Sequence, residues 1–161
     1  MSFFLTLEAC AYTALRSFAD RSSLKPPHLL TGERGEDAAY FHLRKLGYTV
    51  VARRWRAERL NGDLDLIAWD GPALVIFEVK TRTATSREQA FAPAETAVGT
   101  QKQQMLRKMA AAYLRQFPAP ARTSIAVRFD ILSVYQLPSG LEFEHIRNAF
   151  PHAEPVTPRW R

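Results

Sequence analysis

The stretch NGDLDLIAWDGPALVIFEVKTR, residues 61–82, contains two apolar segments separated by the turn sequence Asp-Gly-Pro at 70–72. Glycine and proline favour reversals of the chain because each presets a backbone angle that turns require. We therefore predict a β-hairpin with strands at 63–69 and 74–82. The second strand is apolar on both faces until Glu78, which is typical of a strand in the middle of a covered sheet.

Two carboxylates face each other near the open end of this hairpin. If the turn covers residues 70–73, Asp65 lies opposite Glu78 and Asp63 lies opposite Lys80. Opposed Cβ atoms in antiparallel strands are about 5 Å apart. Two negative charges at that distance repel by about 3 kcal/mol at an effective dielectric constant near 20. A divalent cation that prefers oxygen ligands removes this repulsion, and we expect Mg²⁺ or Mn²⁺.

Further elements on both sides of the hairpin predict an α/β fold. Apolar periodicity and turn residues predict a helix at 33–46, a strand at 48–55, a helix at 100–117, a strand at 124–135 and a last strand at 141–146. The order helix, three strands, helix, strand is typical of a central sheet flanked by helices.

The two ends of the chain have a different composition from this central part. Residues 1–30 are expected to be an N-terminal extension, with a helix at 3–18 and a Ser- and Pro-containing linker at 19–30. The main domain is expected at 31–150 and a flexible Pro-rich tail at 151–161. The start of the chain lacks the early basic residue of a secretory signal, and no apolar run approaches the roughly 20 residues of a membrane span. We expect a cytoplasmic protein without a transmembrane segment, with a membrane-surface helix at 3–18 as the alternative.

The charge of the chain favours a polyanionic partner. Lys and Arg number 22 against 16 Asp and Glu, a formal net charge of +6. Such an excess suits nucleic acid, although a basic surface that binds nothing explains it as well. The lone cysteine, Cys10, excludes an intramolecular disulfide and a cysteine zinc cluster.

A third acid, Glu36, is expected on the buried face of its helix. That face is formed by apolar residues at helical spacing, namely Ala39, Leu43 and Leu46. A carboxylate there needs a cation or a basic partner. Compensation of the helix dipole is the alternative, and it is the explanation that we expect for Glu33 and Asp37.

The run from Asp65 to Glu78-Val79-Lys80 resembles the PD-(D/E)xK nuclease motif, in which these acids and the lysine end adjacent strands. The chain more closely resembles the UPF0102 (YraN-type) family of bacterial proteins. The similar segments lie at 32–39, 46–48, 62–68, 77–82, Lys102 and 128–130. They cover about residues 32–132. Asp63 stands where the family usually has Glu, which keeps the charge on a shorter side chain.

The resemblance implies a restriction-endonuclease-like fold with an α-β-β-β-α-β core and metal-dependent cleavage of DNA. It implies that Asp65 and Glu78 hold Mg²⁺ or Mn²⁺, with the backbone carbonyl of Val79 completing the shell. Lys80 would orient the attacking water or stabilise the transition state. Glu36 would bind a second ion or orient the nucleophile. Branched or damaged DNA, as in repair or recombination, is suggested by analogy with resolvases of this fold.

Several basic residues around this site are candidates for contact with phosphate groups. They are Arg82, Lys102, Arg53, Arg54, Arg56 and Arg59. Trp55 and Trp69 either stack on unpaired bases or belong to the core. In the strand at 124–135, Asp130 is expected to pair with Arg128.

Three alternatives to an active nuclease remain open at this point. Glu78 and Lys80 are a structural ion pair, or the domain binds nucleic acid without efficient catalysis. In the third alternative, the N-terminal helix recruits a repair or membrane complex. The sequence is compatible with a monomer and with a homodimer.

Overall fold

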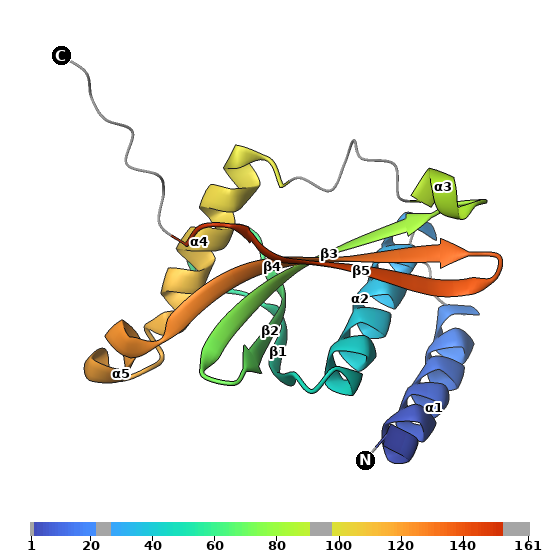
Figure 1. Ribbon diagram of the computed structural model, residues 1–161, viewed down its shortest axis with the longest axis horizontal. Helices are drawn as coiled ribbons and strands as arrows, with labels where there is room; N and C mark the ends of the chain where they lie inside the picture. Colours follow the sequence, from blue (N-terminus) through green and yellow to red (C-terminus); the bar gives the residue numbers. More distant parts are fainter. Residues whose placement is uncertain (1, 22–26, 91–97, 153–161) are drawn as a thin grey trace.

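A computed structural model describes residues 2–21, 27–90 and 98–152, which form a mixed sheet flanked by helices (Figure 1). The elements are α1 (Ser2–Arg21), α2 (Pro27–Lys45), β1 (Thr49–Trp55), β2 (Leu64–Asp70), β3 (Ala73–Thr83), α3 (Arg87–Ala90), α4 (Thr100–Leu114), α5 (Ala119–Ser124), β4 (Ala126–Leu137) and β5 (Gly140–Phe150). The predicted core of helix, three strands, helix and strand is confirmed as α2-β1-β2-β3-α4-β4, with β5 added at the edge. This open α/β arrangement is consistent with a restriction-endonuclease-like fold.

The sheet has five strands in the order β1-β2-β3-β4-β5. Only the central pair, β3 and β4, is parallel, because α4 carries the chain back before β4 begins. The hairpin register is confirmed, with Trp69 opposite Leu74 and Ile67 opposite Ile76. Gly71 has a φ of 58° in the turn, a conformation that glycine adopts at little cost.

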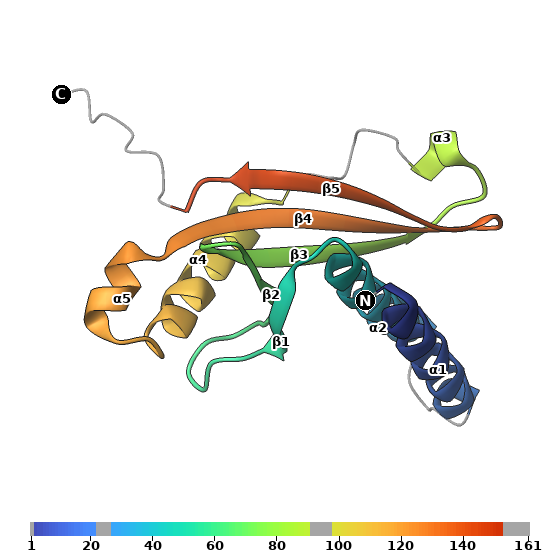
Figure 2. The same ribbon diagram turned by 60° about the horizontal axis from the view of Figure 1, so that its bottom comes forward.

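Helices cover both faces of β3, as its apolar sequence predicts. On one face, residues such as Ile67 and Ile76 pack with Leu106 and Met109 of α4. On the other face, Phe77 and its neighbours pack with α2. The first helix, α1, contacts α2 and lies beside it in both views (Figures 1 and 2).

The predicted linker at 19–30 is wrong wherever the structure describes it. Residues 19–21 belong to α1, and α2 already begins at Pro27, while 22–26 lie outside the described residues. Proline suits the first turn of a helix because the amide hydrogen that it lacks has no helical partner there. The division into extension, domain and tail stays a prediction.

Other predicted boundaries shifted by a few residues. The helix predicted at 100–117 ends at Leu114, and α5 occupies the segment before β4. The last strand is longer than predicted and reaches Phe150. Leu46 was expected in the buried stripe of α2, but it follows the end of the helix and is 55% exposed. None of the helices in the described ranges is both long and apolar enough to cross a bilayer.

Gly35 marks the point where α2 crosses β3. A Cβ atom there would lie 1.7 Å from Thr81 Oγ1, whereas a Cβ at Gly32 in the same helix would meet nothing within 4 Å. We expect Gly35→Ala to destabilise the fold by about 1–3 kcal/mol through overpacking, in spite of the ~1 kcal/mol that alanine gains over glycine in a helix. Gly32→Ala is the matched control and should be neutral or stabilising. Urea unfolding measures both, and equal effects would show that α2 does not approach β3 this closely.

Candidate active site

Asp65 and Glu78 lie on neighbouring antiparallel strands, β2 and β3. The ladder pairs Leu66 with Phe77, and its next step brings Asp65 opposite Glu78. Asp65 Oδ2 accepts a hydrogen bond from the backbone N–H of Val79, with 2.7 Å between the two heavy atoms. The hairpin therefore brings the two acids together at the end of the apolar part of β3, as its register predicts.

Burial and repulsion disfavour the charged forms of both acids. Burial, followed by the charge of Glu78, raises the pKa of Asp65 to about 7, although the Val79 N–H and Lys102 act in the opposite direction. Burial also raises the pKa of Glu78, while the ammonium groups of Lys102 and Lys80 partly offset it. Two neighbouring acids whose pKa values are both raised form a site that a bound cation would stabilise.

A lysine from the opposite layer reaches this pair. Lys102 Nζ lies 3.0 Å from Glu78 Oε2. Burial, the largest single influence, lowers the pKa of Lys102, but the interactions with Glu78 and the charges of Asp65 and Asp63 together outweigh it, so the pKa is raised. Lys102 lies in the first turn of α4, where the positive end of the helix dipole disfavours a cation. The acids, rather than the helix, therefore explain its position.

One oxygen of Glu78 is poorly satisfied. Oε2 is buried and accepts no hydrogen bond from any group in the described ranges. Lys102 supplies a positive charge at 3.0 Å without the geometry of a hydrogen bond. A buried carboxylate oxygen in this condition calls for an explanation, and a bound cation would supply one.

Lys80 belongs to the same cluster. It follows Glu78 by two residues on β3, so both side chains leave the strand on one face. Its charge also lowers the pKa of Glu78, so the two groups interact electrostatically. The structure thus brings together four of the predicted residues, Asp65, Glu78, Lys80 and Lys102.

Glu36 lies close to this cluster but does not join it. Its Oε2 is 2.5 Å from Arg54 Nε, and its charge adds to the raised pKa of Asp65. Within the described ranges, no three carboxylate, imidazole or thiol groups converge on one point as a set of metal ligands. The predicted need of Glu36 for a cation or a basic partner is met here by an arginine.

Two of the arginines that are candidates for contact with phosphate, Arg53 and Arg54, pair with acids in the structure. Arg53 forms an ion pair with Asp37 and lies over the ring of Tyr40, 4.7 Å from its centroid. Arg54 holds Glu36 and has a φ of 48°, a left-handed conformation that is uncommon outside glycine. Both side chains link β1 to α2, so they have a structural role in this arrangement.

The remaining candidates differ in their surroundings. Arg56 is exposed and lies 3.3 Å from Asp63. Because an exposed ion pair contributes little free energy, a phosphate group could take the place of Asp63 as the partner of Arg56 at little cost. Arg82 is half-buried on β3. Trp55 and Trp69 both pack against the core, and Trp55 makes an edge contact with Tyr113. For the tryptophans the core alternative is therefore confirmed.

The expected dipole compensation by Glu33 and Asp37 is wrong. Because α2 begins at Pro27, neither acid lies in its first turn. Glu33 pairs with Arg16 of α1, and Asp37 is buried beside Arg53 and Tyr12. No local pattern marks these pairs, because the partners are 16 to 25 residues apart in sequence.

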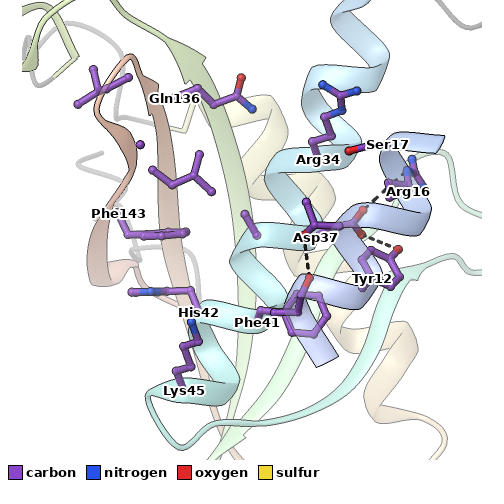
Figure 3. Close-up of a pocket in the computed structure, with 16 residues that line it drawn as sticks. Tyr12, Arg16, Ser17, Arg34, Asp37, Phe41, His42, Lys45, Gln136 and Phe143 are labelled. Carbon is purple, nitrogen blue, oxygen red and sulfur yellow. Dashed lines mark hydrogen bonds and ion pairs between the residues drawn. The ribbon is translucent and has the colours of Figure 1, made fainter. Parts of the chain in front are cut away.

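A cavity of about 580 Å³ lies between α1, α2 and the β4–β5 hairpin (Figure 3). Its lining includes Tyr12, Asp37, Phe41 and Phe143, but neither Asp65 nor Glu78. Sequence reasoning missed it, because segments more than 100 residues apart form its walls. The cavity and the acidic cluster are separate features.

The raised pKa of Asp65 predicts how stability depends on pH. Between about pH 4 and 7, Asp65 holds a proton in the folded protein and releases it in the unfolded chain. The stability that this proton contributes is fully present below about pH 4 and is lost as pH rises through about 7. The loss amounts to at most about 1.4 kcal/mol per pH unit. We expect Asp65→Asn to flatten this slope and to be more stable than wild type at pH 8 in EDTA.

Urea unfolding at several pH values between 5 and 8 measures this effect. Asp63→Asn is the matched control, because Asp63 pairs with Arg56 at a more exposed position, and it should keep the wild-type slope. An unchanged slope in Asp65→Asn would contradict the prediction.

Comparison with known proteins supports the resemblance found in the sequence. The model of the uncharacterised protein family UPF0102 matches residues 35–134. A UPF0102 protein of Koribacter versatilis is 44% identical over 126 residues, which cover 78% of this chain and 82% of the relative. A UPF0102 protein of Solibacter usitatus is 43% identical, over 74% of this chain and 84% of the relative. A UPF0102 protein of Porphyromonas gingivalis is 35% identical, over 81% of this chain and 93% of the relative.

Proposed function

Because this chain belongs to the uncharacterised protein family UPF0102 and carries opposed acids beside two lysines, we propose that it is a metal-dependent endonuclease that hydrolyses phosphodiester bonds in DNA. The buried pair of Asp65 and Glu78 carries the proposal. A surface that only binds phosphate has no use for two neighbouring carboxylates, since their charges would repel the ligand. Acids and a lysine at the ends of adjacent strands are the arrangement that the PD-(D/E)xK resemblance implies.

The residues present fit a hard divalent cation such as Mg²⁺ or Mn²⁺. The Val79 N–H occupies Asp65 Oδ2, which leaves Oδ1 for an ion, and Glu78 Oε2 is buried without a hydrogen bond among the described residues. Mg²⁺ commonly uses one or two carboxylates and completes its shell with water and substrate phosphate, so a third acid is not required. Asp65 and Glu78 would hold the ion, with the backbone carbonyl of Val79 as a further ligand.

The protein's own groups have distinct tasks in this proposal. When bound, a divalent cation supplies charge that polarises the phosphoryl group and makes a bound water more acidic. Asp65 would lose its proton as the cation binds, and the charged form of Glu78 would also be favoured, because a nearby positive charge stabilises a carboxylate. Lys80, on the same face as Glu78, would orient the attacking water or stabilise the negative charge of the transition state. Lys102 would move its ammonium group from Glu78 to the substrate phosphate.

The ion pair between Lys102 and Glu78 favours a second candidate function. If Lys102 neutralises Glu78 permanently, the domain is a nucleic-acid-binding module that keeps the nuclease fold without efficient catalysis. The two candidates differ in metal binding: only the nuclease needs Glu78 to exchange the lysine for a divalent ion.

A cleavage assay tests the proposal directly. Purified protein is incubated with linear, flapped and four-way DNA in Mg²⁺, Mn²⁺ or EDTA. We expect cleavage that depends on the metal, and preference for flapped or four-way DNA would support a role in repair or recombination. Binding of every substrate without cleavage in either metal would favour the second candidate.

A further inference from the structure

A groove runs between the β1–β2 connection and the exposed side of α4. It consists of two adjoining hollows that share Leu60, one of about 410 Å³ and one of about 250 Å³. We call it the basic groove and define it by residues 55–61 together with Gln101, Gln104, Lys108 and Arg115 of α4. The β1–β2 connection and α4 lie on the same side of the sheet in Figure 2.

The cations of the basic groove differ from most others in the protein. In the described part of the chain, the side chains of Arg59, Lys108 and Arg115 are exposed and form no ion pair with an acid. Elsewhere in the described residues, many arginines pair with carboxylates, namely Arg16, Arg34, Arg44, Arg53, Arg54, Arg128 and Arg147. Among the described residues, the basic groove therefore brings together three cations that have no acidic partner, with Glu58 as an opposing acid.

The basic groove is connected to the acidic cluster through α4 and the start of β2. At its near end, Gly62 packs against Met105 of α4, and a Cβ at Gly62 would lie 2.8 Å from the Met105 sulfur. Met105 lines the smaller hollow, and Lys102 precedes it by about one helical turn on α4. Arg56, at the other side, contacts Asp63 at the start of β2. A strand lying in the groove would thus pass close to Asp65 and Glu78.

We propose that the basic groove binds the phosphate backbone of nucleic acid. Three unpaired cations can replace condensed counterions on phosphates, and the release of those ions favours binding. Asn61, Gln101 and Gln104 add amide groups that can donate hydrogen bonds to phosphate oxygens. Delivery of the bound strand to Asp65 and Glu78 rests on the proposed nuclease function, whereas binding itself does not.

The test is a triple variant, Arg59→Gln, Lys108→Gln and Arg115→Gln. Its affinity for labelled single-stranded and duplex DNA is measured by fluorescence anisotropy in EDTA, which prevents metal-dependent cleavage, over a range of salt concentrations. Each lost phosphate contact lowers the salt slope by about 0.9 for duplex and about 0.7 for a single strand. We expect Kd to rise at least tenfold, and the salt slope to fall by about 2.7 if the groove binds duplex or by about 2.1 if it binds a single strand.

A matched control removes three positive charges elsewhere, as Arg44→Gln, Lys45→Gln and Arg147→Gln. These residues lie on α2 and β5, away from the basic groove, so Kd should rise less than threefold. A larger effect with single-stranded than with duplex DNA identifies the single strand as ligand, and the reverse identifies the duplex. An unchanged slope in both arms, or losses equal to those of the control, overturns the proposal.

This experiment separates the basic groove from the nuclease function. If wild type never cleaves DNA and the groove variant still loses affinity, the groove is supported and the nuclease is rejected. If wild type cleaves and the groove variant shows unchanged KM and affinity, the nuclease stands and the groove is rejected.

Discussion

Asp65→Asn is expected to lower metal-dependent cleavage at least a thousandfold, which corresponds to about 4 kcal/mol of transition-state stabilisation. The amide keeps the size of the side chain but removes the charge that would hold the cation. Glu78→Gln should have an effect of similar size, because both acids share one ion in the proposed site. Cleavage of fluorescent DNA under single-turnover conditions measures the loss.

The metal affinity of the same variants supports or contradicts this explanation. Calorimetric titration with Mn²⁺ should show binding to wild type and a loss of at least tenfold in both variants. Asp63→Asn is the control, since Asp63 contacts Arg56 and is not opposed to Glu78, and it should retain cleavage within tenfold. Because Asp65→Asn is expected to be stable at pH 8, unfolding would not explain its inactivity. Wild-type cleavage by both variants would reject the proposed site.

Asp130→Asn is expected to destabilise the fold by about 3–5 kcal/mol, the cost of breaking a buried ion pair. Asp130 is 1% exposed and accepts hydrogen bonds from Arg128, His145 and the backbone N–H of Asn148 at 2.8–2.9 Å. The amide would direct its own N–H groups at these donors and leave Arg128 partly unpaired. The bond to Asn148 also supports a residue with a φ of 51°, at the irregular end of the β4–β5 ladder.

Urea unfolding at pH 7 measures this cost, with Asp70→Asn as the control. Asp70 also contacts Arg128, but its side chain is 34% exposed, so its loss should cost about 1 kcal/mol or less. Burial would raise the pKa of Asp130, but His145, Arg128 and the Asn148 N–H lower it overall. The stability that ionised Asp130 contributes is therefore present above the pKa that Asp130 has in the unfolded chain. It is lost as pH falls through the pKa of Asp130 in the folded protein. A cost for Asp130→Asn no greater than that for Asp70→Asn would contradict this interpretation.

Interactions between residues close in sequence could be predicted correctly. The turn at 70–72 sets the register of β2 and β3, and from that register follows the opposition of Asp65 and Glu78. The apolar run of β3 predicts a strand with helices on both faces, and alternation places Lys80 on the face of Glu78. The pair of Arg128 and Asp130 could be predicted for the same reason, since they are two residues apart on one strand.

Contacts between distant segments could not be predicted in this way. Whether an arginine contacts phosphate or an acid depends on what faces it in space, and Arg53 and Arg54 face acids of α2 that lie 16 to 18 residues earlier. For the same reason, the sequence leaves open whether Glu36 meets a cation or a basic partner, and in the structure Arg54 is such a partner. The contact of Lys102 with Glu78 joins α4 to β3, and the two residues are 24 positions apart in sequence. Arg59 and Arg115 line the same groove only because α4 packs beside the β1–β2 connection.

The sequence by itself determined the strands, their local pairing and the two acids that oppose each other, because backbone geometry relates neighbouring residues directly. Only the tertiary structure decided which cations are neutralised and which remain available to a ligand. The physical reason is that long, charged side chains choose their partners by distance in the folded molecule, and a one-dimensional pattern does not contain that distance.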